Sequence, residues 1–200
     1  GTLLNGESKV DKATAEAIQT LKDNGYEPFI ATGRSSAETR DIMESANIHS
    51  GIFMNGQVVL YQGERVYSSE IPTETVERFH QMVKEDGYGL TAYNNKEFYL
   101  VESSAGAKDA YGFIHTNPPA LKEDFYKENP INMMLFISLP PAEEKYKVAF
   151  PNLDFLRNTP YSVDVISKGN SKAEGIKRFL EYLNQEDAET YAFGDGPNDI

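Results

Sequence analysis

Cysteine is absent from the 200 residues, which excludes a disulfide framework and thiolate chemistry. Basic residues are scarce: 19 Lys and Arg stand against 31 Asp and Glu, a formal net charge of -12 at pH 7. This charge argues against nucleic acid or an anionic membrane as a partner, although it is compatible with a local basic pocket for a phosphate. The sequence also lacks an apolar run of transmembrane length and a signal-peptide pattern, so we expect a cytoplasmic protein without membrane contact.

Helical and strand patterns alternate in the first third of the chain. Residues 8–24 have apolar side chains at helical spacing, and residues 28–31 and 51–54 are short apolar runs typical of buried strands. Between these runs, Ser35 and Glu38 form the capping-box pattern that opens a helix. Alternating strands and helices predict an α/β fold, with a Rossmann-like parallel sheet covered by helices.

The middle of the chain differs in character from both flanks. Residues 57–71 have the pattern of a β-hairpin. Residues 73–165 are rich in hairpin patterns and tyrosine, and we interpret them as an inserted α+β module. The helix–strand alternation returns in residues 166–200, so the predicted organisation is a core domain of residues 1–72 and 166–200 around an inserted domain of residues 73–165.

The last predicted strand, residues 190–193, runs into a turn that carries oxygen ligands. Asp195, Asn198 and Asp199 would lie just beyond the carboxyl end of this strand, where open α/β sheets bind ligands. Two nearby carboxylates repel each other unless a cation or a proton lies between them, and oxygen-only ligands suit Mg²⁺. Every residue of the turn is also a good turn former, so a plain turn is an equally good interpretation of this stretch alone.

Two further segments offer groups for an anion. Thr32, Gly33 and Arg34 follow a predicted strand and open a helix, where a hydroxyl and free N–H groups can hold a phosphate oxygen. Lys172 occupies the first position of the helix capped by Ser171, which is electrostatically unfavourable unless an anion binds there. The alternatives are an unliganded helix start, a solvated lysine and, for Arg34, a surface ion pair.

Asn55 and Gly56 end a third predicted strand, a position where this dipeptide is more often just a turn. Because ligands collect at one edge of such a sheet, we expect Thr2, Thr32, Asn55, Lys172 and Asp195 to converge there.

The order of these motifs resembles the haloacid dehalogenase (HAD) superfamily of phosphohydrolases, and most closely its Cof-type group, subfamily IIB. Residues 1–4 (Gly-Thr-Leu-Leu) resemble the end of the first family motif, D-x-D-G-T-L-L. Residues 31–34 resemble the second motif, residues 171–172 the third and residues 194–199 the fourth, and Asn55-Gly56 fits the Cof-type group. The resemblance spans all 200 residues in the family order and indicates a chain truncated at both ends.

The resemblance implies a HAD-like core with an inserted cap of the C2 type. It also implies an Mg²⁺-dependent phosphatase that acts on small phosphorylated metabolites, such as sugar phosphates, through an aspartyl-phosphate intermediate. Thr32 and Lys172 would bind the phosphoryl group, Gly33, Arg34 and Asn55 would line the substrate site, and Asp195, Asn198 and Asp199 would serve the metal.

The nucleophilic Asp and the general acid/base Asp of the family would precede residue 1. We therefore expect the 200-residue chain to be inactive on its own. Two other functions are compatible with the same motifs: a phosphotransferase or phosphomutase of this superfamily, and a non-catalytic module that binds sugar phosphates.

Overall fold

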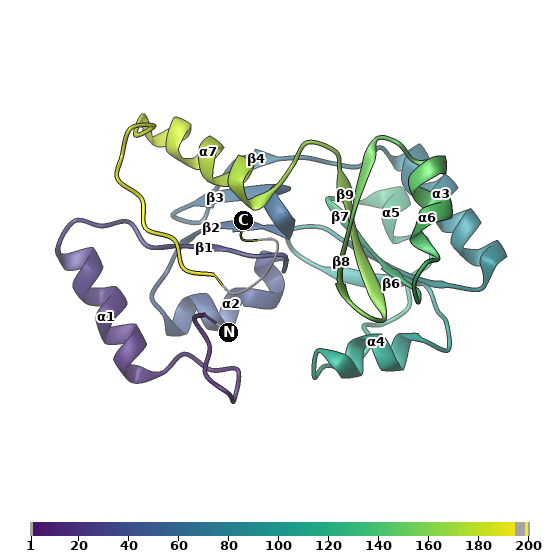
Figure 1. Ribbon diagram of the computed structural model, residues 1–200, viewed down its shortest axis with the longest axis horizontal. Helices are drawn as coiled ribbons and strands as arrows, with labels where there is room; N and C mark the ends of the chain where they lie inside the picture. The colour runs from purple at the N-terminus through teal and green to yellow at the C-terminus, as the bar shows by residue number, and fades with distance from the viewer. Residues whose placement is uncertain (1, 195–198, 200) are drawn as a thin grey trace. The chain divides into compact units, whose positions relative to one another are not determined.

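The chain forms two compact units in the computed structural model, which describes residues 2–194 and residue 199 (Figure 1). One unit, here called the core unit, consists of residues 1–68 and 170–200. The other, called the inserted unit, consists of residues 69–169, a range slightly wider at both ends than the expected 73–165.

The core unit is built on a four-stranded sheet in the order β1-β2-β3-β4. Strands β1 and β2 pair in parallel, whereas β3 pairs antiparallel with both of its neighbours. The described sheet is therefore mixed: one parallel pair is extended by the hairpin expected at residues 57–71. The elements of this unit are α1 (Lys12–Asp23), β1 (Phe29–Ala31), α2 (Ser36–Ser45), β2 (Ser50–Phe53), the 3-10 turn η1 (Met54–Gly56), β3 (Val58–Tyr61), β4 (Glu64–Ser68) and α7 (Lys172–Leu183).

Helices cover both faces of this sheet (Figure 1). Phe29 and Ala31 point to the face on which Phe179 of α7 packs. Ile30 points the opposite way and packs with Ile18 of α1. This alternation follows from the two-residue period of a strand, and it gives each helix an apolar surface to cover.

The expected strand at residues 190–193 is wrong for the described chain. Residues 190–193 belong to no strand, and the side chains of Tyr191 and Phe193 are 64% and 82% exposed. An apolar run becomes a strand only where a neighbouring strand offers backbone hydrogen bonds, and none of the described strands pairs with this run. Apolar composition alone was therefore an insufficient signal.

Helix α7 begins in close contact with the loop that follows β2. A Cβ atom added to Gly56 would overlap the carbonyl oxygen of Ser171 and would lie 2.7 Å from its carbonyl carbon. That oxygen already accepts the first hydrogen bond of the helix, from the backbone N–H of Gly175 at 2.9 Å. A Cβ atom added to Gly175 would likewise clash with the side chain of Ile52 in β2. Two glycines thus let the start of α7 approach the end of β2.

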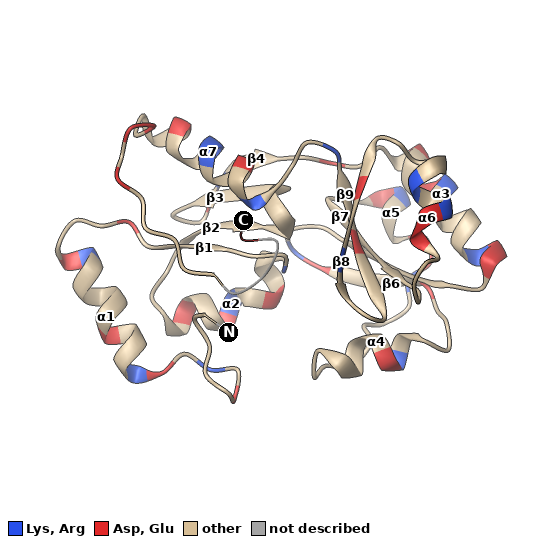
Figure 2. Ribbon diagram, viewed as in Figure 1, with Lys and Arg blue, Asp and Glu red and all other residues tan. Residues whose placement is uncertain are grey.

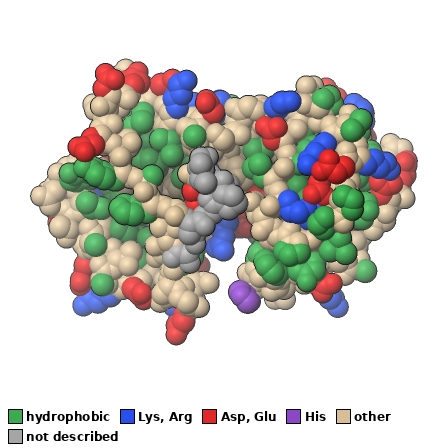
Figure 3. All heavy atoms as spheres, in the orientation of Figure 1, with side chains coloured by type: hydrophobic (Ala, Val, Ile, Leu, Met, Phe, Trp, Pro, Cys, Tyr) green, Lys and Arg blue, Asp and Glu red, His purple; other side chains and the backbone are tan. Residues whose placement is uncertain are grey.

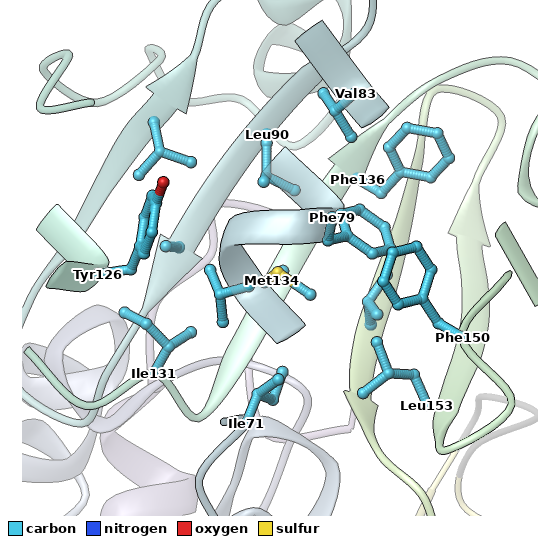
Figure 4. Packing of buried hydrophobic residues seen from close by; sticks show 14 of the residues in the cluster. Ile71, Phe79, Val83, Leu90, Tyr126, Ile131, Met134, Phe136, Phe150 and Leu153 are labelled. Atoms are coloured by element: carbon cyan, nitrogen blue, oxygen red, sulfur yellow. The ribbon is translucent and has the colours of Figure 1, made fainter. Parts of the chain in front are cut away.

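The inserted unit is an antiparallel five-stranded sheet in the order β6-β5-β7-β9-β8. Helices α3, α5 and α6 pack on one face, and α4 packs on the other. Phe79 of α3 lies at the centre of the larger cluster, among aromatic rings that include Phe136 and Phe150 (Figure 4). The elements are α3 (Thr73–Asp86), β5 (Gly89–Tyr93), β6 (Phe98–Glu102), α4 (Ala107–Phe113), α5 (Phe125–Glu128), β7 (Met133–Ile137), α6 (Glu143–Ala149), β8 (Leu153–Thr159) and β9 (Ser162–Ser167).

A buried ion pair joins α6 to β8 in this unit. Arg157 donates from Nε and Nη2 to the two carboxylate oxygens of Glu143, each at 2.6 Å. The side chains of Glu143 and Arg157 are only 9% and 19% exposed. The hydrogen bonds from Arg157 hold the pKa of the Glu143 carboxyl below its ordinary value of 4.5, against the opposing effect of burial. The pair is therefore a stabilising contact that depends on an ionised carboxylate.

The surface carries scattered hydrophobic side chains among charged ones (Figure 3). Among the helices of the described residues, none combines the length and the apolar character required to span a bilayer.

We predict that the Gly56→Ala substitution destabilises the core unit far more than Gly63→Ala does. Both glycines have positive φ, 93° and 82°, but a Cβ at Gly63 meets no atom within 4 Å. Backbone strain alone should cost about 1 kcal/mol at Gly63, whereas overlap with Ser171 should raise the cost at Gly56 to roughly 3 kcal/mol. Urea unfolding of both variants measures the difference. Equal losses would show that the contact with Ser171 is not tight.

The ion pair predicts an acid-dependent loss of stability. A lowered pKa in the folded state contributes stability above the unfolded pKa, and this contribution is lost as the pH falls through the folded pKa. At pH 7, Glu143→Gln should lower the free energy of unfolding by about 2 kcal/mol. The difference in unfolding free energy between this variant and the wild type should disappear below pH ~4.

Glu144→Gln on the same helix is the matched control, because Glu144 is exposed and pairs with Lys147 at the surface. Denaturant unfolding between pH 3 and pH 7 gives both curves. A gap for Glu143→Gln that stays constant with pH would contradict the proposed role of the ion pair.

Candidate active site

Thr32 lies directly after β1 and starts the loop that leads into α2. Its backbone N–H still donates to the Ile52 carbonyl of β2 at 2.9 Å, so the residue stays attached to the sheet. Its Oγ1 accepts a hydrogen bond from the Arg34 N–H at 3.1 Å. Since a hydroxyl can accept and donate at once, the Thr32 proton remains available to an anion.

Helix α2 begins as expected at a capping box. The Ser35 hydroxyl oxygen accepts from the Glu38 N–H, and the Ser35 N–H donates to the Glu38 carboxylate at 2.8 Å. These bonds fix the direction of the helix start. Gly33 and Arg34 fill the short segment between Thr32 and this cap, and Arg34 is exposed.

The loops after β1 and β2 are joined by backbone hydrogen bonds. The Asn55 N–H donates to the Thr32 carbonyl at 3.1 Å, and the Met54 N–H donates to the Arg34 carbonyl at 3.0 Å. Asn55 is only 1% exposed and has a φ of 55°, a left-handed conformation uncommon for a residue other than glycine. Neighbours on two elements therefore hold Asn55 in a sparsely populated conformation, which is typical of a functional loop.

Lys172 joins this edge of the sheet from α7. The Ser171 hydroxyl caps the helix by accepting from the Glu174 N–H at 3.1 Å, and Ser171 itself contacts Gly56. The side chain of Lys172 is only 12% exposed, and its Nζ lies 2.6 Å from Oδ1 of Asp199. The positive charge of the Lys172 ammonium adds to the partial positive charge of the helix N-terminus. The Asp199 carboxylate offsets part of this charge.

Acidic and basic side chains both occur along α7 (Figure 2).

An ammonium has three donors, so the ion pair with Asp199 leaves Lys172 able to donate to a second anion. A hydroxyl, backbone N–H groups and a buried cation are the groups that bind a phosphoryl oxygen.

The structure links four of the predicted site residues through direct contacts or through their chain neighbours: Thr32, Asn55, Lys172 and Asp199. Thr2 is exposed, and its site role stays a prediction. Asp195 and Asn198 lie outside the described residues, so Asp199 is the described member of the predicted metal ligands. Within residues 2–194 and 199, no group of three or more His, Asp or Glu side chains is arranged to hold a metal ion.

Sequence reasoning missed one polar cluster beside Lys172, formed by Tyr67, Asn170 and Arg178. Tyr67 of β4 and Arg178 of α7 both donate a hydrogen bond to Asn170, which directly precedes the helix cap. A polar residue just before a helix cap is common, and an arginine in mid-helix is usually solvated. Their pairing therefore left no signal in the sequence.

Known proteins are similar to this chain in sequence and in fold. The model of the haloacid dehalogenase-like hydrolase family matches residues 1–200. YkrA of Bacillus subtilis (strain 168), which carries the provisional name of a phosphatase, is 31% identical over 201 residues, covering 100% of this chain and 78% of its own. A Geobacillus kaustophilus protein superposes with a TM-score of 0.92 at 29% identity, covering 100% of this chain and 78% of that one.

The HAD subclass IIB sugar phosphatase BT4131 superposes with a TM-score of 0.84 at 26% identity, covering 100% of this chain and 79% of its own. The family match and these likenesses confirm the resemblance that the motif order suggested. The chain therefore belongs to the haloacid dehalogenase-like hydrolases.

Proposed function

We propose that the protein is a phosphatase that hydrolyses phosphoric monoesters of small metabolites such as sugar phosphates. The observation that carries this proposal is the half-buried Lys172 side chain at the start of α7, linked through Ser171 and Gly56 to the loops after β1 and β2. Membership of a hydrolase family and the likeness to a sugar phosphatase support the same reaction class.

The described residues would bind and orient the phosphoryl group. The Thr32 hydroxyl and the Gly33 N–H would donate to the phosphoryl oxygens, and Lys172 would offset their charge. Arg34 is exposed beside them and would face the remainder of an anionic substrate. Donors that are fixed before the substrate arrives stabilise developing charge without reorganisation, which is the main source of catalysis in phosphoryl transfer.

The family resemblance implies that the attacking group is an aspartate carboxylate. In that reaction an aspartate oxygen bonds to phosphorus while the ester oxygen leaves and takes a proton from a second carboxylic acid. A water molecule gives a proton to the second carboxylate and attacks the phosphorus, the bond between phosphorus and the aspartate oxygen breaks, and inorganic phosphate and the free aspartate are released. This chain contributes the phosphate-binding groups to both steps.

Mg²⁺ is the proposed cofactor. Asp195, Asn198 and Asp199 offer oxygen atoms only, a donor set that fits this ion, and the Asp199 carboxylate lies beside Lys172. Asp195 would bind the ion directly, with Asn198 and Asp199 in support. When bound, Mg²⁺ would neutralise phosphate charge and align the displacement.

We predict that Lys172→Ala lowers kcat/KM for p-nitrophenyl phosphate by about a hundredfold to a thousandfold in the full-length protein, because one preorganised charge is lost. Lys177→Ala is the matched control, since Lys177 is an exposed lysine on the same helix. Phosphate release with Mg²⁺ and with a chelator measures both variants.

Near-full activity of Lys172→Ala would contradict the assignment of Lys172. Phosphate binding without turnover by the full-length wild type would favour a non-catalytic module. Transfer of the phosphoryl group to an added sugar in place of water would favour a phosphotransferase.

A further inference from the structure

A buried amide lies directly ahead of the helix that carries Lys172. Asn170 precedes the capping residue Ser171 and is only 9% exposed. Its Oδ1 accepts two hydrogen bonds, one from the Tyr67 hydroxyl at 3.1 Å and one from Nη1 of Arg178 at 2.9 Å. The two donors come from β4 and from the middle of α7, so two separate elements hold the amide.

Arg178 is itself held in place by an aromatic ring. Its guanidinium carbon lies 4.1 Å from the centroid of the Tyr67 ring. A guanidinium is flat and permanently charged, so it stacks on the ring while it donates a charge-assisted hydrogen bond. Tyr67 therefore both orients Arg178 and shares its acceptor, and the three side chains form one closed cluster.

This cluster acts on the backbone from which Lys172 extends. Asn170 is two residues away from Lys172, and Ser171 between them is fixed by its capping bond and its contact with Gly56. The Lys172 side chain is only 12% exposed and its Nζ is paired with Asp199, so a shift of the main chain at the start of α7 would displace the ammonium. A small displacement of a phosphate-binding group is enough to slow the reaction strongly.

We propose that Tyr67, Asn170 and Arg178 form a positioning clamp for Lys172 and that none of the three touches the substrate. The proposal rests on the phosphatase function proposed above. The clamp fixes the start of α7, so that the Lys172 ammonium meets the phosphoryl group without reorganisation. The alternative is a cluster that stabilises the fold and has no effect on Lys172.

The test is a double-mutant cycle in the full-length protein. Arg178→Met removes the donor and keeps a long side chain, and it is combined with Lys172→Ala. Lys177→Met is the control, because it makes the same kind of change at an exposed position one residue away. The measurements are kcat and KM for p-nitrophenyl phosphate and the inhibition constant for inorganic phosphate.

We expect Arg178→Met to lower kcat/KM about tenfold and to raise both KM and the inhibition constant. In the Lys172→Ala background the same change should cost less than about twofold, because a residue that acts through Lys172 has nothing left to position. Lys177→Met should match the wild type. Arg178→Lys should recover part of the loss, since it retains the positive charge and can still donate to Asn170.

Three results would overturn the clamp. An equal loss in both backgrounds would mean that Arg178 acts on the substrate directly. A lower kcat with unchanged KM and unchanged inhibition by phosphate would mean only that fewer molecules fold. Wild-type kinetics of Arg178→Met, beside a strong loss in Lys172→Ala, would remove the clamp and leave the proposed function intact.

Tyr67→Phe keeps the test decisive if Arg178→Met does not fold. It removes one donor to Asn170 and retains the ring under Arg178. A loss of two- to threefold that disappears in the Lys172→Ala background would support the clamp, and wild-type kinetics would overturn it. Full activity of Lys172→Ala itself would overturn the phosphatase assignment of Lys172 and the clamp together.

Discussion

The close approach of Gly56 to the Ser171 carbonyl is the contact on which the candidate site depends. It brings the first residue of α7 against the loop after β2, and hydrogen bonds between Asn55, Met54 and the loop after β1 extend the contact to Thr32. Any side chain at position 56 would displace a carbonyl that is already committed to the helix. One glycine therefore determines whether groups from three parts of the chain form a single anion site.

Charge at this site is balanced by short-range pairing. Lys172 is largely buried, and its cost of desolvation is offset by Asp199 and by the approach of an anion. Arg178, the other cation near the start of α7, is occupied by Asn170 and the Tyr67 ring. The two cations therefore have different proposed tasks: Lys172 would bind the phosphoryl group, and Arg178 would hold the backbone at the start of α7. A local cation of this kind is compatible with the proposed phosphate site in a protein with a net charge of -12.

Features fixed by local contacts could be predicted from the sequence, and features fixed by distant neighbours could not. The helix starts at Ser35 and Ser171 were predictable because a cap bonds to its own next turn. The expected helix from residue 8 begins only at Lys12, because the Asn5 side chain binds the N–H groups of Glu7 and Lys9 in a turn.

Three other features depend on tertiary partners: the failed strand at residues 190–193, the left-handed Asn55 and the pairing of Arg178 with Asn170.

We propose that Thr32 and Lys172 belong to one phosphate site. Tungstate is a phosphate mimic with a strong anomalous signal, and its position in crystals of the full-length protein tests this claim directly. We expect one dominant anomalous peak within hydrogen-bonding distance of both the Thr32 hydroxyl and the Lys172 ammonium, and we expect this peak to be lost in Lys172→Ala. Tungstate bound only elsewhere, or bound unchanged in the variant, would contradict it.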